Sequence, residues 1–137
     1  MKVIYFSLIY FHILYGIIFW SYASKTERNK VFIIQKKIIR IISNSNRLDH
    51  PELLFKRLNI LQLYDLRRFE MSKFVYEDLF YEKQFNFTSR NSVHTHGTRN
   101  SQLLAYPHPR FNILLNSVFY QRLKIFKEIP AAIRSAD

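Results

Sequence analysis

The sequence predicts an all-α protein. Apolar residues recur at spacings of three and four along most of the first 81 residues, as they do on one face of a helix. Only two glycines and four prolines interrupt the 137 residues, and 48% of the residues are apolar, which argues against a disordered chain. We expect a small bundle of about four helices at residues 1–81, an irregular basic arm at 82–111, and a short final helix within a C-terminal segment at 112–137.

Residues 3–20 are almost entirely apolar and have three interpretations. The run is close to the length of a membrane span, and with Lys2 before it and Ser21-Tyr22-Ala23 after it, it also imitates a signal peptide. The third interpretation is a helix buried on several sides. Three tyrosines lie within the run: Tyr5, Tyr10 and Tyr15. Their hydroxyls favour the buried helix, because a protein interior supplies hydrogen-bond partners more readily than lipid does.

A second helix is predicted from Ser24 to about Ser43. Ser24 and Glu27 have the spacing of a capping box at its start. Its predicted apolar face consists of Val31, Ile34, Ile38, Ile41 and Ile42. Residues 25–47 contain seven basic side chains and one acidic side chain, a local charge of +6. The whole chain carries a formal net charge of +11, which predicts attraction to nucleic acid or to an anionic membrane surface.

Two further helices are predicted in the first 81 residues. Asp49 is placed to cap a short helix that has Pro51 in its first turn. The apolar side of this helix is predicted to be Leu53, Leu54, Leu58 and Leu61. The next helix runs from about Gln62 to Tyr81 and carries mixed charges. We expect a solvated face on it that includes Glu77 and Asp78, with exposed pairs such as that of Glu70 and Lys73.

The C-terminal part of the chain is basic and has no clear helical period at 84–111. Residues 83–127 contain no acidic residue and seven basic ones. His94 and His96 could suggest a metal pair, but the chain has no cysteine and His108 is the other nearby ligand, so we expect a loop without metal. The absence of cysteine also fits a reducing compartment.

The order of short motifs resembles a region of the reverse transcriptases of jockey-like non-LTR retrotransposons, namely the region that follows the catalytic palm. The matching residues are Tyr15-Gly16, Trp20, Gln35, Ile39-Arg40-Ile41-Ile42, Leu54-Phe55, Leu58, Ile60-Leu61 and Asp65-Leu66. A weaker match to the family's tail follows at His96-Gly97-Thr98-Arg99, Tyr120, Lys124, Ile125, Phe126, Ile129-Pro130 and Ile133. The tail departs from the family at Arg122-Leu123, where Gly-Pro is usual, and at Phe126-Lys127, where Trp-Asn is usual.

The resemblance implies a thumb-like region that grips the template–primer duplex without catalysing its extension. In the family the palm holds Mg²⁺ with an aromatic-x-Asp-Asp turn and a further Asp, and this chain has no Asp-Asp. We therefore expect no enzyme activity and no cofactor in this chain alone. The expected partners are the RNA or DNA backbone, bound without sequence preference, and the palm domain of a parent polymerase.

Six basic residues are predicted to contact phosphates: Lys30, Lys36, Lys37, Arg40, Arg99 and Arg110. The residues considered for stacking on bases are Phe85, Phe87, Phe111, Phe119 and Tyr120. Of the aromatic residues near the C-terminus, Phe119 and Phe126 are expected to lie in the core instead.

Two other functions remain open on the sequence. One is a small basic protein that is membrane-anchored or secreted through residues 1–23, and the other is a remnant of a mobile element with no ligand. The thumb-like interpretation predicts an intracellular location, cytoplasmic or nuclear.

Overall fold

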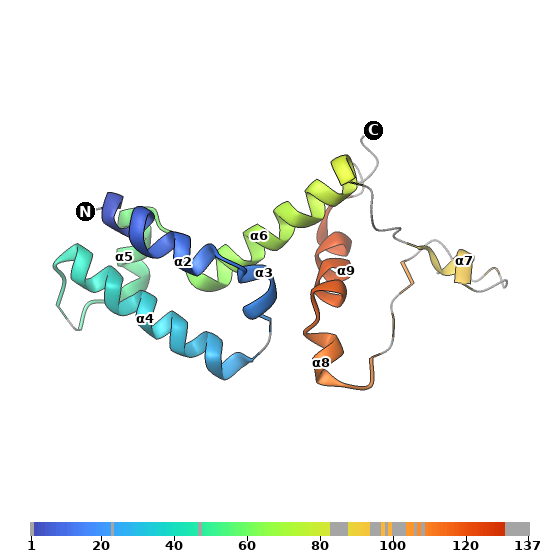
Figure 1. Cartoon of the computed structure of the whole chain (residues 1–137), viewed down its shortest axis with the longest axis horizontal. Coiled ribbons are helices and arrows are strands. Elements are labelled where there is room, and N and C mark those ends of the chain that lie inside the picture. Colours follow the sequence, from blue (N-terminus) through green and yellow to red (C-terminus); the bar gives the residue numbers. More distant parts are fainter. Residues whose placement is uncertain are drawn as a thin grey trace. The chain divides into compact units, whose positions relative to one another are not determined.

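A computed structural model describes residues 2–22, 24–46, 48–82, 88–93, 97, 99, 104–105, 107 and 109–130. The helices are α1 (Lys2–Ile4), η1 (Tyr5–Tyr10), α2 (Phe11–Leu14), α3 (Ile17–Trp20), α4 (Lys25–Ser43), α5 (Pro51–Leu58), α6 (Leu63–Glu77), η2 (Asp78–Glu82), α7 (Arg90–Val93), α8 (Asn112–Leu115) and α9 (Val118–Glu128). Within the described ranges the only extended pairing is an isolated bridge between Ser89 and Leu104. The predicted all-α class is confirmed (Figure 1).

The chain forms two compact units, Met1–Glu70 and Met71–Asp137. The predicted boundaries at residues 81 and 111 stay predictions. Much of the predicted arm at 82–111 lies outside the described residues. The described part of that arm contains the short helix α7 and the Ser89–Leu104 bridge.

The apolar run at the N-terminus forms successive helical segments. Helical turns continue from α1 through the π-helical η1 to α2, and the chain then turns at Gly16 before α3. Gly16 has a φ of 62°, a left-handed conformation that glycine adopts without the penalty of a side chain. The indole Nε1 of Trp20 donates to the carbonyl of Tyr15, 3.0 Å away, and closes the turn. In the part of the chain that is described, no helix combines the length and the apolar character that crossing a membrane requires.

Helix α4 agrees with its predicted bounds, but its buried face is only partly the predicted one. The predicted apolar stripe included Ile34 and Ile41, and the structure shows these two side chains exposed. Ile42 is buried as predicted, and Gln35 and Ile39, which lie outside the predicted stripe, are buried as well. The buried face differs from the predicted one because the polar residue Gln35 lies at its centre. A prediction from apolar spacing alone places such a residue on the solvent-exposed side.

Gln35 connects three segments of the first unit through its side-chain amide. Its Nε2 donates to the hydroxyl of Tyr5 at 2.9 Å and to the carbonyl of Leu61 at 3.1 Å. Its Oε1 accepts from the backbone N–H of Leu63 at 2.9 Å, at the start of α6. The fully buried amide therefore has partners on both ends, as buried polar groups require.

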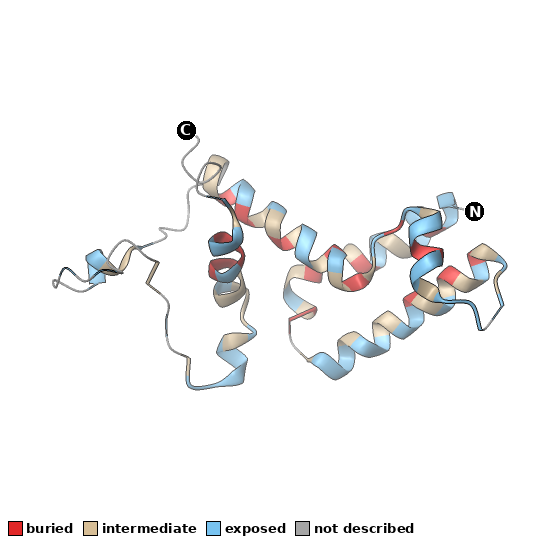
Figure 2. Cartoon of the chain, turned by 180° about the vertical axis from the view of Figure 1, so that it is seen from behind, coloured by how far each residue is buried: buried red, intermediate tan, exposed pale blue. Residues whose placement is uncertain are grey.

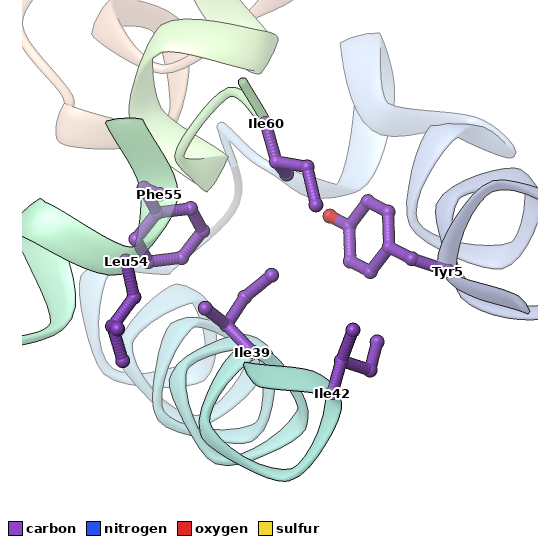
Figure 3. Packing of buried hydrophobic residues seen from close by; sticks show 6 residues of the cluster. All are labelled: Tyr5, Ile39, Ile42, Leu54, Phe55 and Ile60. Carbon is purple, nitrogen blue, oxygen red and sulfur yellow. The ribbon is translucent and has the colours of Figure 1, made fainter. Parts of the chain in front are cut away.

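Apolar packing surrounds this hydrogen-bonded amide. One cluster consists of Tyr5, Ile39, Ile42, Leu54, Phe55 and Ile60 and joins η1, α4 and α5 (Figure 3). A second consists of Ile13, Ile17, Leu63 and Leu66 and joins α2, α3 and α6. The Tyr5 ring lies within the first cluster, and burial raises the pKa of its hydroxyl above the ordinary value.

Two predicted caps in this unit are not formed. Ser24 occupies the N-cap position of α4, but its side chain makes no capping hydrogen bond, and Glu27 pairs with Lys30. His50, not Asp49, is the N-cap of α5, and the Asp49 carboxylate accepts from the backbone N–H of Asn46 at 2.9 Å. A capping spacing in the sequence marks where a helix begins, while the rotamer depends on competing partners.

The C-terminal ends of α4 and α5 each use an asparagine in a left-handed conformation. Asn44 follows α4 with a φ of 47°, and Asn59 follows α5 with a φ of 52°. After each asparagine, a backbone N–H reaches back to a carbonyl of the last turn, from Ser45 to Arg40 and from Ile60 to Phe55. These bonds satisfy carbonyls that a helix end leaves without partners.

The second unit contains a buried ion pair. The carboxylate of Asp78 in η2 pairs with the guanidinium of Arg122 in α9, and the two side chains are only 4% and 3% exposed. The Arg122 guanidinium also lies 4.8 Å from the ring centroid of Phe74. The expected solvated position of Asp78 is therefore wrong, because the sequence does not show its partner 44 residues away.

Other charge predictions for α6 are partly corrected. Lys73 pairs with Glu77 at 3.9 Å, and not with Glu70 as expected. Both partners are exposed, so the pair contributes little to stability. On the apolar side of the short helix α5, Leu54 is buried as predicted, whereas Leu53 is exposed.

Candidate nucleic-acid interface

The exposed face of α4 presents two of the predicted phosphate-binding residues. Lys30 and Lys37 are seven residues apart, which is close to two turns, so they lie on the same face of the helix. Both are exposed, and helical spacing places them opposite the buried residues Gln35, Ile39 and Ile42. Figure 2 shows exposed, partly buried and buried turns along α4. The rise of a helix separates the two positions by about 10 Å along the axis. The face can therefore meet more than one phosphate.

Lys36 and Arg40 lie one turn apart on the flank of this face, and both are partly buried. The ammonium of Lys36 lies 4.1 Å from the ring centroid of Phe32. That ring in turn makes an edge contact with Tyr64. A cation–π contact of this kind contributes about 0.5–1 kcal/mol at an exposed site. It holds the Lys36 charge close to the helix while leaving it accessible.

Lys30 has an acidic neighbour on the same helix. Its ammonium lies 2.8 Å from the Glu27 carboxylate, and the two side chains are 65% and 66% exposed. An exposed pair of this kind contributes at most about 1 kcal/mol and weakens with salt. A polyanion can therefore displace Glu27 from Lys30.

Arg28, which adds to the positive charge of this segment, has a structural contact. Its Nη1 donates to the carbonyl of Ser21 at 2.8 Å, and Arg67 of α6 donates to the same carbonyl at 3.4 Å. Arg67 also lies over the ring of Tyr22, and burial lowers the pKa of its guanidinium. The Arg28 guanidinium fastens the turn after α3 to α4, and the Arg67 guanidinium fastens it to α6, so neither belongs to the candidate interface.

Three isoleucines share the exposed face with the lysines. Ile33, Ile34 and Ile41 are 51%, 55% and 76% exposed. The sequence pattern placed Ile34 and Ile41 in the core, so this mixture of cationic and apolar side chains was not predicted. The sequence carries no signal for this mixture, because the burial of Gln35 depends on partners at Tyr5 and at the start of α6.

The remaining predicted phosphate contacts belong to the second unit. Arg99 and Arg110 are both exposed there. The six predicted residues are thus divided, four on α4 and two in the other unit, and their role stays a prediction. The histidine pair His94 and His96 lies outside the described residues.

The second unit also contains a groove that was not predicted from the sequence. Its volume is about 540 Å³, and it is lined by Leu115, Asn116, Tyr120, Gln121, Lys124 and Lys127. Tyr120 was considered for base stacking, and both lysines belong to the acid-free segment. Their spacing of four and then three residues places all three on one side of a helix, a signal that could have grouped them.

The comparisons with known proteins do not identify the chain. No family model, no curated protein and no solved structure matches it significantly. The resemblance to retrotransposon reverse transcriptases therefore remains a prediction from short motifs.

Proposed function

We propose that the exposed face of α4 binds the phosphate backbone of RNA or DNA without sequence preference. The observation that supports this proposal is the alignment of Lys30 and Lys37 on one exposed face, with Lys36 and Arg40 on its flank. Ammonium and guanidinium groups bind phosphate oxygens by charge-assisted hydrogen bonds and by release of counterions. Contacts to the backbone carry no direct information about base sequence.

By the motif resemblance, we further propose that this binding is the non-catalytic, thumb-side part of a retrotransposon reverse transcriptase. The duplex of template and primer would then lie along α4, and the parent palm would supply Mg²⁺ and the chemistry. Sequencing the transcript upstream of the Met1 codon tests the parentage. An in-frame segment with an aromatic-x-Asp-Asp turn is expected, and its absence would count against the parent polymerase without affecting binding by α4.

Binding by the α4 face is tested with a labelled RNA–DNA hybrid and the full chain. Fluorescence anisotropy at several KCl concentrations gives the slope of the logarithm of affinity against the logarithm of salt. A triple variant, Lys30→Gln, Lys36→Gln and Lys37→Gln, is expected to flatten the slope by about 0.9 for each lost phosphate contact.

A matched control removes the same charge from other places. Lys2, Lys56 and Lys73 are exposed and lie outside α4. Their combined change to glutamine lowers the net charge by the same amount and is expected to alter the slope much less. Equal losses in the two triple variants would show that the net charge, and not the α4 face, attracts the hybrid.

A second candidate, peripheral binding to an anionic membrane surface, is favoured by the isoleucines on the same face. Ile33, Ile34 and Ile41 have no apolar partner on a phosphate backbone, whereas a bilayer surface accepts apolar and basic side chains together. Sedimentation with vesicles that contain phosphatidylserine tests this candidate. The change Ile41→Ser is expected to weaken vesicle binding and to leave hybrid binding unchanged, so the two candidates separate.

A further inference from the structure

The groove beside α9 is built by one polar stripe of that helix and the end of α8. Tyr120, Lys124 and Lys127 follow one another along α9 and line the groove. The opposite side of α9 is buried through Arg122, Leu123, Ile125 and Phe126. The core therefore holds α9 in an orientation that keeps the polar stripe toward solvent.

Hydrogen bonds hold the corner between α8 and α9. The Ser117 hydroxyl accepts from the backbone N–H of Tyr120 at 3.2 Å and donates to the carbonyl of Leu114 at 2.7 Å. The Gln121 amide nitrogen donates to the carbonyl of Leu115 at 2.7 Å. This bond orients Gln121 and leaves its amide oxygen as an acceptor at the groove. The wall of the groove is thus positioned before any ligand binds.

The chemistry of the lining selects an anion with a flat, hydrogen-bonding part. No carboxylate lines the groove, and in the described part of the chain neither Lys124 nor Lys127 forms an ion pair. Asn116 and Gln121 supply amide groups, and Tyr120 supplies an aromatic ring. Tyr120 also borders a smaller apolar hollow of about 210 Å³ that Phe119 helps to line. The prediction that Phe119 lies in the core is wrong, because its side chain is 48% exposed.

We propose that the α8–α9 groove binds a single-stranded segment of nucleic acid, with a base stacked on Tyr120 and phosphates at Lys124 and Lys127. Stacking on an aromatic ring tolerates any base, and amide side chains can bond to base edges. The proposal concerns residues separate from α4 and does not depend on binding by α4.

Photo-crosslinking of the full chain tests the position of the base. The probe is an eight-nucleotide oligothymidylate with one 5-iodouracil, and trypsin releases the peptide from Phe111 to Arg122. An adduct on Tyr120 is the expected result. Adducts confined to other peptides would overturn the proposal.

Variants of the groove test the contacts by anisotropy with a fluorescein-labelled octamer. Tyr120→Leu is expected to weaken binding roughly tenfold, while Tyr120→Phe keeps the ring and the affinity. The double change Lys124→Gln and Lys127→Gln is expected to lower the salt slope by about 1.4, two single-strand contacts. Circular dichroism checks that α9 stays folded, which is expected because the lysines do not contact the core. Unchanged affinity in both Tyr120→Leu and the double lysine variant would refute the groove as a site.

Two further comparisons separate the explanations. If inorganic phosphate displaces the octamer as well as thymidine monophosphate does, the groove is a simple anion site and the proposal fails. The triple α4 variant is expected to retain the Tyr120 adduct. If the wild-type chain forms no Tyr120 adduct while the triple α4 variant still flattens the salt slope, the groove proposal alone is refuted. If the Tyr120 adduct forms while the triple α4 variant leaves the salt slope unchanged, the α4 proposal alone is refuted.

Discussion

The two units each bury a polar side chain, but they use different chemistry to do so. In Met1–Glu70 the largest buried polar group is the neutral amide of Gln35, which bonds two main-chain groups and one hydroxyl. In Met71–Asp137 it is the charged pair of Arg122 and Asp78. The amide is compatible with burial because its hydrogen bonds are satisfied, whereas each buried charge depends on the opposite charge beside it.

This difference predicts how each unit responds to substitution. A change at Gln35 leaves main-chain groups without partners, and no second substitution can remove the Leu61 carbonyl. A change at one member of the ion pair leaves a buried charge, but replacing both members by apolar residues removes the problem. We therefore expect that a second substitution can restore the stability of the second unit after loss of Arg122 or Asp78, but cannot restore that of the first unit after loss of Gln35.

The largest effect is expected for Arg122→Met. Asp78 would remain buried without its cation, and breaking a buried pair in this way costs about 3–5 kcal/mol. Hydrogen exchange of the α9 amides measures the loss. Lys73→Met, which removes a lysine from the exposed pair with Glu77, is the control and is expected to cost less than about 1 kcal/mol.

The double change Arg122→Met and Asp78→Leu sharpens this test. Apolar replacement of both members of a buried pair is often neutral or stabilising, so most of the loss is expected to be recovered. A double variant as unstable as Arg122→Met would show that the pair is needed for its geometry and not only for its charge balance.

A smaller loss, about 2–4 kcal/mol, is expected for Gln35→Leu. The buried Leu63 N–H and the partly buried Leu61 carbonyl would lose their partner, and each unsatisfied group carries a penalty that grows with its burial. Urea denaturation followed by Trp20 fluorescence measures this unit. Tyr5→Phe removes only the hydroxyl partner and is expected to cost about 1 kcal/mol. Equal losses in the two variants would contradict the central role of the amide.

The smallest effect compares the helix caps of the two units. Ser117 accepts the backbone N–H of Tyr120, whereas Ser24 makes no capping bond. Ser117→Ala is therefore expected to cost about 1 kcal/mol and Ser24→Ala only a few tenths. Unfolding midpoints in urea give both values. A larger loss at Ser24 would show that its capping box forms in solution.

The sequence by itself determined the helical class and most helix positions in the first 82 residues. The predicted helix from Ser24 to Ser43 agrees with α4 at Lys25–Ser43, and the predicted helix at 62–81 agrees with α6 followed by η2. These features depend on spacing, on few breaking residues and on turn residues such as Asn44 and Asn59. All of them act over a few positions along the chain.

Only the tertiary structure decided which face of each helix is buried and which charges are paired. Ile34 and Ile41 are exposed while Gln35 is buried, because Tyr5 and the start of α6 offer partners at one side of α4. Asp78 is buried because Arg122 meets it from α9. Likewise, Lys124 and Lys127 line a groove because the buried side of α9 turns their stripe outward. Burial and pairing depend on residues distant in the sequence, and a local pattern does not specify which distant residues meet.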